Sequence, residues 1–326
     1  MSAPRGHHLV PQTYQRGFAR RHGKIWQVRV INRSTGAQRL SNVADTFKRR
    51  DWNTIVDADG TKDFAIEQLL ADLVDSPAAP ALEALRADRY PLDDGQREHL
   101  ARFISAQLTR GRHIRENLEK FMIETGRRVV SLAAQHYTDE HWIRAIGEVP
   151  SAETRAALLH SERHFDLKPT NAGMLDALLS TVDDIAGPLL GRSWTLVRFA
   201  EPCLLTSEHP VIYANHTGSR LGYGVATADQ IYLPVSPTHG LVLSHPWAGW
   251  PDALVNGTPE LARRLNWAVL AFPTSDELLA HPDVQCHPLP GAAVLAAAAS
   301  HWPWPAAEHS GARMPDWWQR FIGHAA

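Results

Sequence analysis

The chain has 326 residues, of which 44% are hydrophobic and 21% are charged, and its formal net charge is −2. These proportions are typical of a folded globular protein and exclude a disordered or collagen-like chain. The two cysteines are too few for a disulfide framework, and no apolar run reaches the ~20 residues that a membrane span needs. We therefore expect a cytoplasmic protein with no membrane partner.

Charge is distributed unevenly along the first hundred residues. Residues 1–50 contain eleven Lys or Arg and one acid, whereas residues 51–100 contain twelve acids and four bases. Two explanations stay open. Either the two segments neutralise each other in the fold, or the basic segment faces a phosphate-bearing partner such as a nucleic acid.

The first part of the chain predicts a β-hairpin, and the middle predicts helices. A β pattern at 25–31 and a weaker one at 40–47 flank turn residues at 32–36. From residue 64 the apolar residues recur at helical spacing, and this pattern stops before Pro77. Further helices are expected at 79–88, from a cap at Asp93-Asp94 onward, up to about 135, and at 139–147, 151–164, 171–187 and 258–271.

After Gly191 the apolar period returns to two, which predicts strands at 194–206, 211–213, 231–235 and 240–244. The expected fold class is α+β: predominantly helical, with a small antiparallel sheet built from the N-terminal hairpin and the 194–245 strands. We expect residues 1–285 to form a single α+β domain. Residues 286–326 are then a Trp-, Pro- and Ala-rich C-terminal extension packed on it.

The extension carries four indoles close together, at Trp302, Trp304, Trp317 and Trp318. Such an apolar area is rarely left in solvent. It is expected to cover the body of the protein, or to bind a protein partner or a second copy of the chain.

The motifs typical of nucleotide-binding, serine-hydrolase and zinc-protease sites are missing from this sequence. Three polar patches remain as candidate sites. The first runs from His7 to Phe18, where Pro11 stiffens the chain between the histidines and Tyr14. Imidazole serves as a ligand, acid or base near neutral pH, but incidental histidines in a mobile N-terminus would look the same.

The second patch lies on the long helix that begins near Asp93. Gln107 interrupts an apolar face there, and Arg110 follows on nearly the same side. A buried amide and a buried guanidinium need partners. They either pair with Glu67 and backbone carbonyls or face a cleft and bind an anion.

The third patch is Thr206-Ser207-Glu208-His209-Pro210, at the end of a predicted strand. A hydroxyl, a carboxylate and an imidazole at a strand terminus are typical of a site, although the same residue types also make ordinary turns. His160 and His164 have chelating spacing on a predicted helix, but no third ligand is near, so we expect no metal there.

At these patches the chain resembles the bacterial and fungal proteins called domain of unknown function 4238. The resemblance covers most of residues 7 to 270, and the family more often has Asp where this chain has Glu208. Because that family has no assigned activity, the resemblance implies an architecture and a candidate site only. The matching motifs are His8-Leu9-Val10-Pro11-Gln12-Thr13-Tyr14 with Phe18, Phe64-Ala65-Ile66-Glu67, Gln107 with Arg110, Trp194 leading to Ser207-Glu208-His209-Pro210, and Pro234-Val235-Ser236-Pro237.

The leading functional hypothesis is a metal-dependent hydrolase, phosphodiesterase-like or nuclease-like, that acts on a phosphate-containing small molecule or a nucleic acid. A divalent metal would bind at Glu208 and His8, or these groups would transfer protons, while Arg110 stabilises negative charge. The alternative is a non-catalytic module that binds a nucleotide or a partner through the same cluster; a structural ion-pair network would look similar. The predicted catalytic residues are His8, Glu67, Arg110 and Glu208, and the predicted substrate-binding residues are Gln107, Tyr14, Ser207 and His209.

Overall fold

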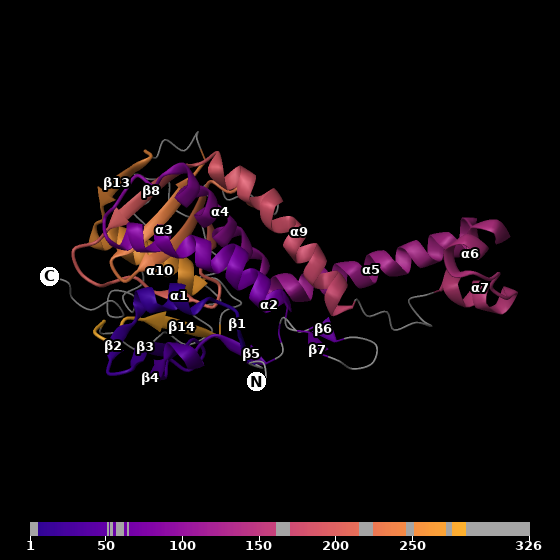
Figure 1. Cartoon of the computed structure of the whole chain (residues 1–326), viewed down its shortest axis with the longest axis horizontal. Coiled ribbons are helices and arrows are strands. Elements are labelled where there is room, and N and C mark those ends of the chain that lie inside the picture. Colours follow the sequence, from indigo (N-terminus) through magenta and orange to yellow (C-terminus); the bar gives the residue numbers. More distant parts are fainter. Residues whose placement is uncertain are drawn as a thin grey trace. The chain divides into compact units, whose positions relative to one another are not determined.

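The computed structural model describes residues 6–50, 52, 55–56, 62–63, 65–160, 170–214, 224–245, 251–271 and 276–284. The chain divides into two compact units (Figure 1). The larger unit combines residues 1–111 with residues 178–326, and the smaller unit is residues 112–177. The predicted C-terminal extension, 286–326, lies outside the described residues, so its packing stays a prediction.

Helix α4 of the larger unit begins at a capping box. In α4 the Asp93 side chain accepts from the backbone N–H of Gln96, and the Gln96 side chain accepts from the N–H of Asp93. This capping box confirms the helix start predicted at Asp93-Asp94. The helices are α1 (Gln12–Gln15), α2 (Ala65–Leu70) continued by a π-helical segment (Ala71–Asp75), α3 (Ser76–Arg86), α4 (Asp94–Thr109), α9 (Asn171–Leu190, which begins in the smaller unit) and α10 (Pro259–Ala271).

The N-terminal hairpin belongs to a sheet with the order β2-β3-β14-β9, in which β4 also pairs with β3. All of its pairings are antiparallel. Strand β14 pairs with β3 on one side and with β9 on the other. The strands are β2 (Arg20–His22), β3 (Ile25–Asn32), β4 (Gln38–Asn42), β9 (Thr206–Ser207) and β14 (Glu277–Ala280).

The second sheet has the order β10-β11-β12-β8-β13, antiparallel except for the β8–β13 pair. Every residue of β11 and β12 is buried. The strands are β8 (Ser193–Arg198), β10 (Ile212–Ala214), β11 (Gln230–Ser236), β12 (His239–Ser244) and β13 (Ala253–Asn256). Two short pairs are separate: β1 (Gly6–His8) with β5 (Lys48–Arg50), and β6 (Ile55–Val56) with β7 (Lys62–Asp63).

The predicted α+β class is confirmed. The strands expected in one small sheet lie in two larger ones, because β14 joins the hairpin to β9 while β8 and β10–β12 pair among themselves. The largest fully buried side chains include Trp194, Tyr14, Tyr232, Phe18 and Phe103. Burial of Tyr14 and Phe18 confirms that the N-terminal segment 7–18 is packed and is not a free tail.

The smaller unit is helical and contains α5 (Arg112–His136), α6 (Asp139–Ile146), α7 (Ala152–Leu159) and the first turns of α9. Trp142 and Leu175 are its only buried side chains among those described. Across the described part of the chain, no helix is both long and apolar enough to cross a membrane.

Candidate functional site

Tyr14 is the point at which three of the sequence motifs meet. Its buried ring lies 5.8 Å from the ring of Phe18 and 6.0 Å from that of Phe103 on α4, between ring centroids. Its hydroxyl donates to the carbonyl of Pro234, and the Thr206 hydroxyl lies 2.8 Å from the same oxygen. Burial raises the pKa of the Tyr14 hydroxyl well above its usual range, so the group stays protonated. These contacts make Tyr14 a structural link.

Arg86 on α3 fixes the same segment from the other side. Its guanidinium donates to the carbonyls of Val235 at 3.1 Å and Tyr14 at 3.0 Å, with a longer contact of 3.4 Å to Thr13. A Cβ atom on Gly17 would lie 2.4 Å from this guanidinium. Glycine at position 17 therefore gives the arginine the space that it needs.

The C-terminal end of α4 holds the second predicted patch. The Arg110 guanidinium pairs with both carboxylate oxygens of Asp75, at 3.0 and 3.1 Å. The partner considered from the sequence, Glu67, lies on α2 with its side chain outside the described residues. Gln107 is only 4% exposed, and among the described residues neither atom of its amide has a hydrogen-bond partner. Leaving such an amide buried costs about 1–3 kcal/mol, which a polar ligand would recover.

The two histidines of the first patch point to opposite faces of β1, because successive side chains alternate along a strand. His8 lies opposite Lys48 in the β1–β5 pair. Its Nδ1–H donates to the carbonyl of Thr46 at 3.2 Å, so its Nε2 accepts from the Gln12 amide at 3.1 Å. His7 is 1% exposed and lies opposite Arg49, on the other face.

Glu208 lies among charged groups from other elements. Its carboxylate is buried, and Oε1 accepts from the backbone N–H of Asp276 at 2.9 Å. The Asp276 carboxylate lies 3.6 Å from the guanidinium of Arg49. His7 lies opposite Arg49 in the β1–β5 pair, and Asp276 contacts both Arg49 and Glu208. We call these four residues, His7, Arg49, Glu208 and Asp276, the Glu208 cluster. Arg49 and Asp276 are 42% and 60% exposed, so solvent reaches the cluster from their side.

Ser207 and His209 form the turn that carries Glu208. The Ser207 hydroxyl accepts from the backbone N–H of His209 at 3.1 Å and donates to its carbonyl at 2.9 Å. This geometry is the turn that the sequence allowed as an alternative to a site. It places the Glu208 carboxylate against β14.

Among the described contacts, three of the predicted catalytic residues have different partners. His8 contacts Thr46 and Gln12, Arg110 contacts Asp75, and Glu208 contacts Asp276. Within the described ranges, no three His, Cys, Asp or Glu side chains are grouped closely enough to hold a metal ion. His164 and the Glu67 side chain lie outside those ranges, so the metal at Glu208 and His8 stays a prediction.

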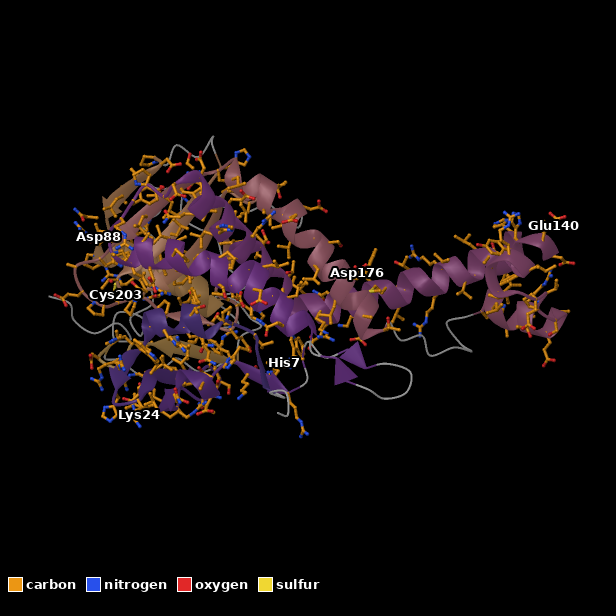
Figure 2. The ribbon with its side chains drawn as sticks, viewed as in Figure 1. His7, Lys24, Asp88, Glu140, Asp176 and Cys203 are labelled. Atoms are coloured by element: carbon orange, nitrogen blue, oxygen red, sulfur yellow. The ribbon has the colours of Figure 1, made fainter. Side chains whose placement is uncertain are left out.

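Ser236, His239 and Asp88 are hydrogen-bonded in the order of a serine-hydrolase triad but with the two ring nitrogens of the histidine exchanged, and their exposure also argues for a structural role. Ser236 Oγ lies 3.0 Å from His239 Nδ1, and His239 Nε2 donates to Asp88 at 3.1 Å. The serine is buried, whereas the aspartate, labelled in Figure 2, is 40% exposed. A nucleophile must reach its substrate, whereas here solvent reaches only the acid. Ser236 also accepts from the Thr238 N–H at 3.2 Å, which completes a turn between β11 and β12.

Cys203 is not an active nucleophile. Burial raises the pKa of its thiol to about 12, so the thiolate is scarce at neutral pH (Figure 2).

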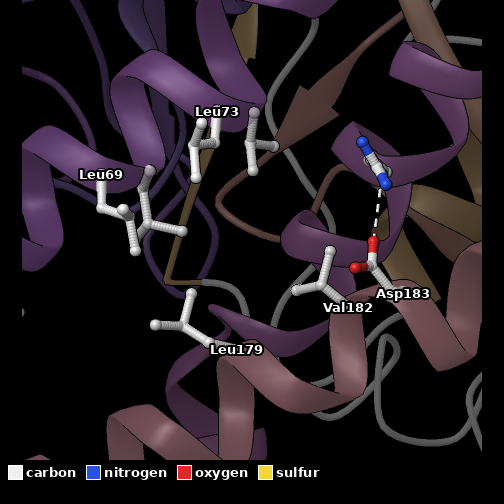
Figure 3. A pocket seen from close by; sticks show the side chains of 8 residues that line it. Leu69, Leu73, Leu179, Val182 and Asp183 are labelled. Atoms are coloured by element: carbon white, nitrogen blue, oxygen red, sulfur yellow. Dashed lines mark hydrogen bonds and ion pairs between the residues drawn. The ribbon is translucent and has the colours of Figure 1, made fainter.

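An apolar groove of about 310 Å³ lies between the α2 region, α4 and α9 (Figure 3). Leu69, Leu73, Leu179 and Val182 line it, and Arg102 pairs with Asp183 at its edge at 3.0 Å. The groove shares no residue with the Glu208 cluster. Its lining is too apolar for a phosphate group.

The basic residues of the N-terminal segment form ion pairs with acids that the sequence did not predict as their partners. Arg20 pairs with Asp283, Arg39 with Glu277 and Arg49 with Asp276. Neutralisation by the acids of 51–100 was the first explanation of the charge pattern. The ion pairs described for the basic segment instead use residues 276–283, because β14 inserts beside β3.

Sequence reasoning missed His7, Arg49 and Asp276. A signal existed for His7, since alternation along a strand shows that only one histidine of an adjacent pair can face a given side. Asp276 had none, because it precedes a strand of four residues, β14, that lacks a clear pattern of its own.

No curated protein and no solved structure matches this chain. A family model matches residues 6–282, which is most of the chain, and its description is "Protein of unknown function (DUF4238)". The match agrees with the resemblance carried by the His8–Tyr14 and Ser207–Pro210 motifs. The chain belongs to the DUF4238 family of proteins of unknown function.

Proposed function

We propose that the protein is a hydrolase acting on a phosphate-containing substrate, with the Glu208 cluster as its centre. The observation that carries the proposal is the connection of a buried carboxylate, Glu208, through Asp276 to the guanidinium of Arg49, which lies opposite His7 in the β1–β5 pair. Carboxylate and imidazole are the usual groups for proton transfer. A guanidinium matches the geometry and charge of phosphoryl oxygens.

The reaction would be attack of water on phosphorus. Water forms the new P–O bond as the bond to the leaving alcohol breaks. Glu208 accepts the proton of the water, and His7 donates a proton to the alcohol. Arg49, held by Asp276 and open to solvent, stabilises the charge on the phosphoryl oxygens. Arg110, already paired with Asp75, is assigned to positioning, and Gln107 to binding a polar part of the substrate.

The metal-dependent form of this proposal uses Glu208 with His8 and Glu67 as ligands. Carboxylate oxygen and imidazole nitrogen suit zinc, and carboxylates also suit magnesium. His8 and Arg49 lie on different faces of the β1–β5 pair. The metal-free and the metal-dependent forms of the proposal therefore predict different responses to mutation. His7→Asn abolishes the metal-free reaction, whereas His8→Asn abolishes the metal-dependent one.

The test is hydrolysis of phosphomonoester and phosphodiester chromogenic substrates and of generic RNA and DNA, with EDTA or with added Mg²⁺, Mn²⁺ or Zn²⁺. Glu208→Gln is expected to lower kcat/KM at least about 100-fold, because a proton acceptor is lost while shape is kept. The matched control is Glu277→Gln, an acid on the adjacent strand that pairs with Arg39. It is expected to stay within about threefold of the wild type. Equal loss in both variants would contradict the proposal.

A second candidate, a nucleotide- or nucleic-acid-binding module, is favoured by the basic strand β5, where Lys48 and Arg50 are exposed beside Arg49. It predicts no hydrolysis but binding of a generic oligonucleotide at about 50 mM salt that is lost by about 200 mM, because neutralised phosphates release counterions. Lys48→Gln with Arg50→Gln should weaken binding and flatten the salt dependence, whereas Lys24→Gln, on the turn between β2 and β3, should not.

We also propose a cytoplasmic location, supported by the scarcity of cysteine. We further propose that the Trp-rich segment 286–326 binds a protein partner or a second copy of the chain. Removing that segment tests it through the oligomeric state of the protein.

A further inference from the structure

Exposed apolar side chains are concentrated in the smaller unit. Of the twelve large hydrophobic residues exposed in the described part of the chain, seven belong to residues 112–177. Three of these lie on α5, namely Phe121 at 63%, Val129 at 56% and Leu132 at 54% exposure. An apolar surface of this kind marks an interaction site more often than a monomer surface.

The exposed apolar residues of α5 form one stripe along the helix. Phe121 and Leu132 are eleven residues apart, and so are the half-buried Leu118 and the exposed Val129. A spacing of eleven residues is three turns of 3.67 residues, which keeps a stripe on one face of a nearly straight helix. The remaining face of α5 packs within the unit, where the Ser131 hydroxyl donates to the carbonyl of Leu159 on α7. The stripe is therefore the outer face of the helix.

Phe121 and Leu132, the two ends of the exposed stripe, can be matched by a two-fold operation. When a second α5 is laid antiparallel with the two-fold axis between residues 126 and 127, Phe121 becomes level with Leu132 of the second copy. Glu124 and Arg128 flank the stripe on one side and are both exposed. The same operation brings Glu124 to within about one residue's rise, 1.5 Å along the axis, of Arg128 of the other copy, and this happens twice.

We propose that this face binds a second copy of the same chain, α5 against α5, as an antiparallel two-fold dimer. A two-fold interface requires a surface that is complementary to itself, and both the apolar spacing and the charge pair of α5 meet this condition. A helix that lies on a membrane surface instead has a polar face dominated by Lys and Arg. The polar flank of α5 alternates acid and base, so a second copy fits it better. This proposal is independent of the Glu208 cluster.

The test is the oligomeric state of the full chain, measured by sedimentation velocity across a concentration series up to about 100 µM, the range in which a modest interface associates. The wild type is expected to be dimeric at the upper end. Phe121→Arg is expected to raise the dissociation constant at least about tenfold, because each dimer loses two central apolar contacts and brings two charges into the interface. The control is Leu40→Arg on β4, a residue 50% exposed, which should leave the constant unchanged.

A charge swap separates this geometry from a general loss of helix stability. Glu124→Arg alone places like charges together and should weaken the dimer, and Arg128→Glu alone should do the same. The double variant restores both pairs and should dimerise like the wild type. A chain truncated after residue 285 should still dimerise, which separates this face from the Trp-rich segment. A monomeric wild type, or single and double swaps with the same constant, would overturn the proposal.

Discussion

Helices α4 and α5 follow one another in the chain and both carry an apolar stripe, but the burial of the two stripes differs. Nine of the sixteen residues of α4 are buried, whereas none of the described side chains of α5 is. The stripe of α4 is covered by α1, α3 and the π-helical segment of the same chain. The pair shows that an amphipathic pattern predicts that a face will be covered but does not say by what. We expect the two units to differ in stability as they differ in burial.

The largest effect is expected at Arg86, which ties α3 to the N-terminal segment and to β11. Arg86→Met keeps the length of the side chain but leaves the carbonyls of Val235 and Tyr14 without their donor. We expect the free energy of unfolding of the larger unit to fall by about 3 kcal/mol or more, because several charge-assisted hydrogen bonds are lost from a partly buried site. Urea denaturation measures this change.

The matched control for Arg86 is Arg102→Met on α4, whose guanidinium makes only partly exposed ion pairs with Glu98 and Asp183. Its cost is expected to be below about 0.5 kcal/mol. Similar costs for the two arginines would show that the Arg86 contacts contribute little.

Hydrogen exchange should separate the two units directly. Amides of β11 and β12, whose side chains are all buried, should be protected at least about 100-fold more than amides in the middle of α5. Mass spectrometry of exchanged peptides measures the ratio. Protection of α5 that rises with protein concentration would indicate that α5 takes part in self-association. Equal protection at low concentration would mean that the units unfold together.

Two glycines of the larger unit should respond to alanine with opposite signs. At Gly257 a Cβ would lie 2.2 Å from the ring of Phe199, so Gly257→Ala is expected to cost about 1–3 kcal/mol through overpacking. At Gly187 on α9 a Cβ meets nothing within 4 Å, and alanine is expected to stabilise the helix by up to about 1 kcal/mol. Thermal melts of both variants measure the difference. Two changes of the same sign would contradict the packing described around Phe199.

The smallest effect is expected at Asp88, and it depends on pH. The hydrogen bond from His239, helped by Arg198, holds the pKa of the Asp88 carboxyl below its usual range. A folded-state pKa below the unfolded one stabilises the protein above the unfolded value of about 4, and this contribution is lost as pH falls through the folded value. Because the side chain is 40% exposed, solvent screening keeps the gain below about 1 kcal/mol.

Asp88→Asn isolates this charge, since asparagine also tolerates the positive φ of 57° at this position. The variant should be slightly less stable than the wild type at pH 7, and the two should converge as the pH falls through the folded-state pKa of Asp88. A gap that widens as the pH falls would show that the sign is wrong.

Local signals in the sequence were sufficient for part of this structure. The start of α4 followed from Asp93 and Gln96, and the anchoring of the N-terminal segment followed from Tyr14 and Phe18, because these depend on neighbours in the chain. Which of His7 and His8 lies opposite Arg49 did not follow, since it depends on the pairing of β1 with β5, in which His7 and Arg49 are 42 residues apart in the chain. Asp75, the partner of Arg110, was hidden for the same reason.

The late position of strand β14 in the sequence affects how the chain folds during synthesis. It supplies the neighbour that β3 needs, pairing residues 29–32 with residues 277–280, so the N-terminal hairpin is among the first segments synthesised and among the last to be completed. Until then one edge of β3 carries unpaired backbone groups, which are open to wrong partners. Contacts between such distant segments also slow folding. A nascent chain halted before residue 277 would therefore present an open sheet edge, and the same protein would depend more on chaperones during translation than after release.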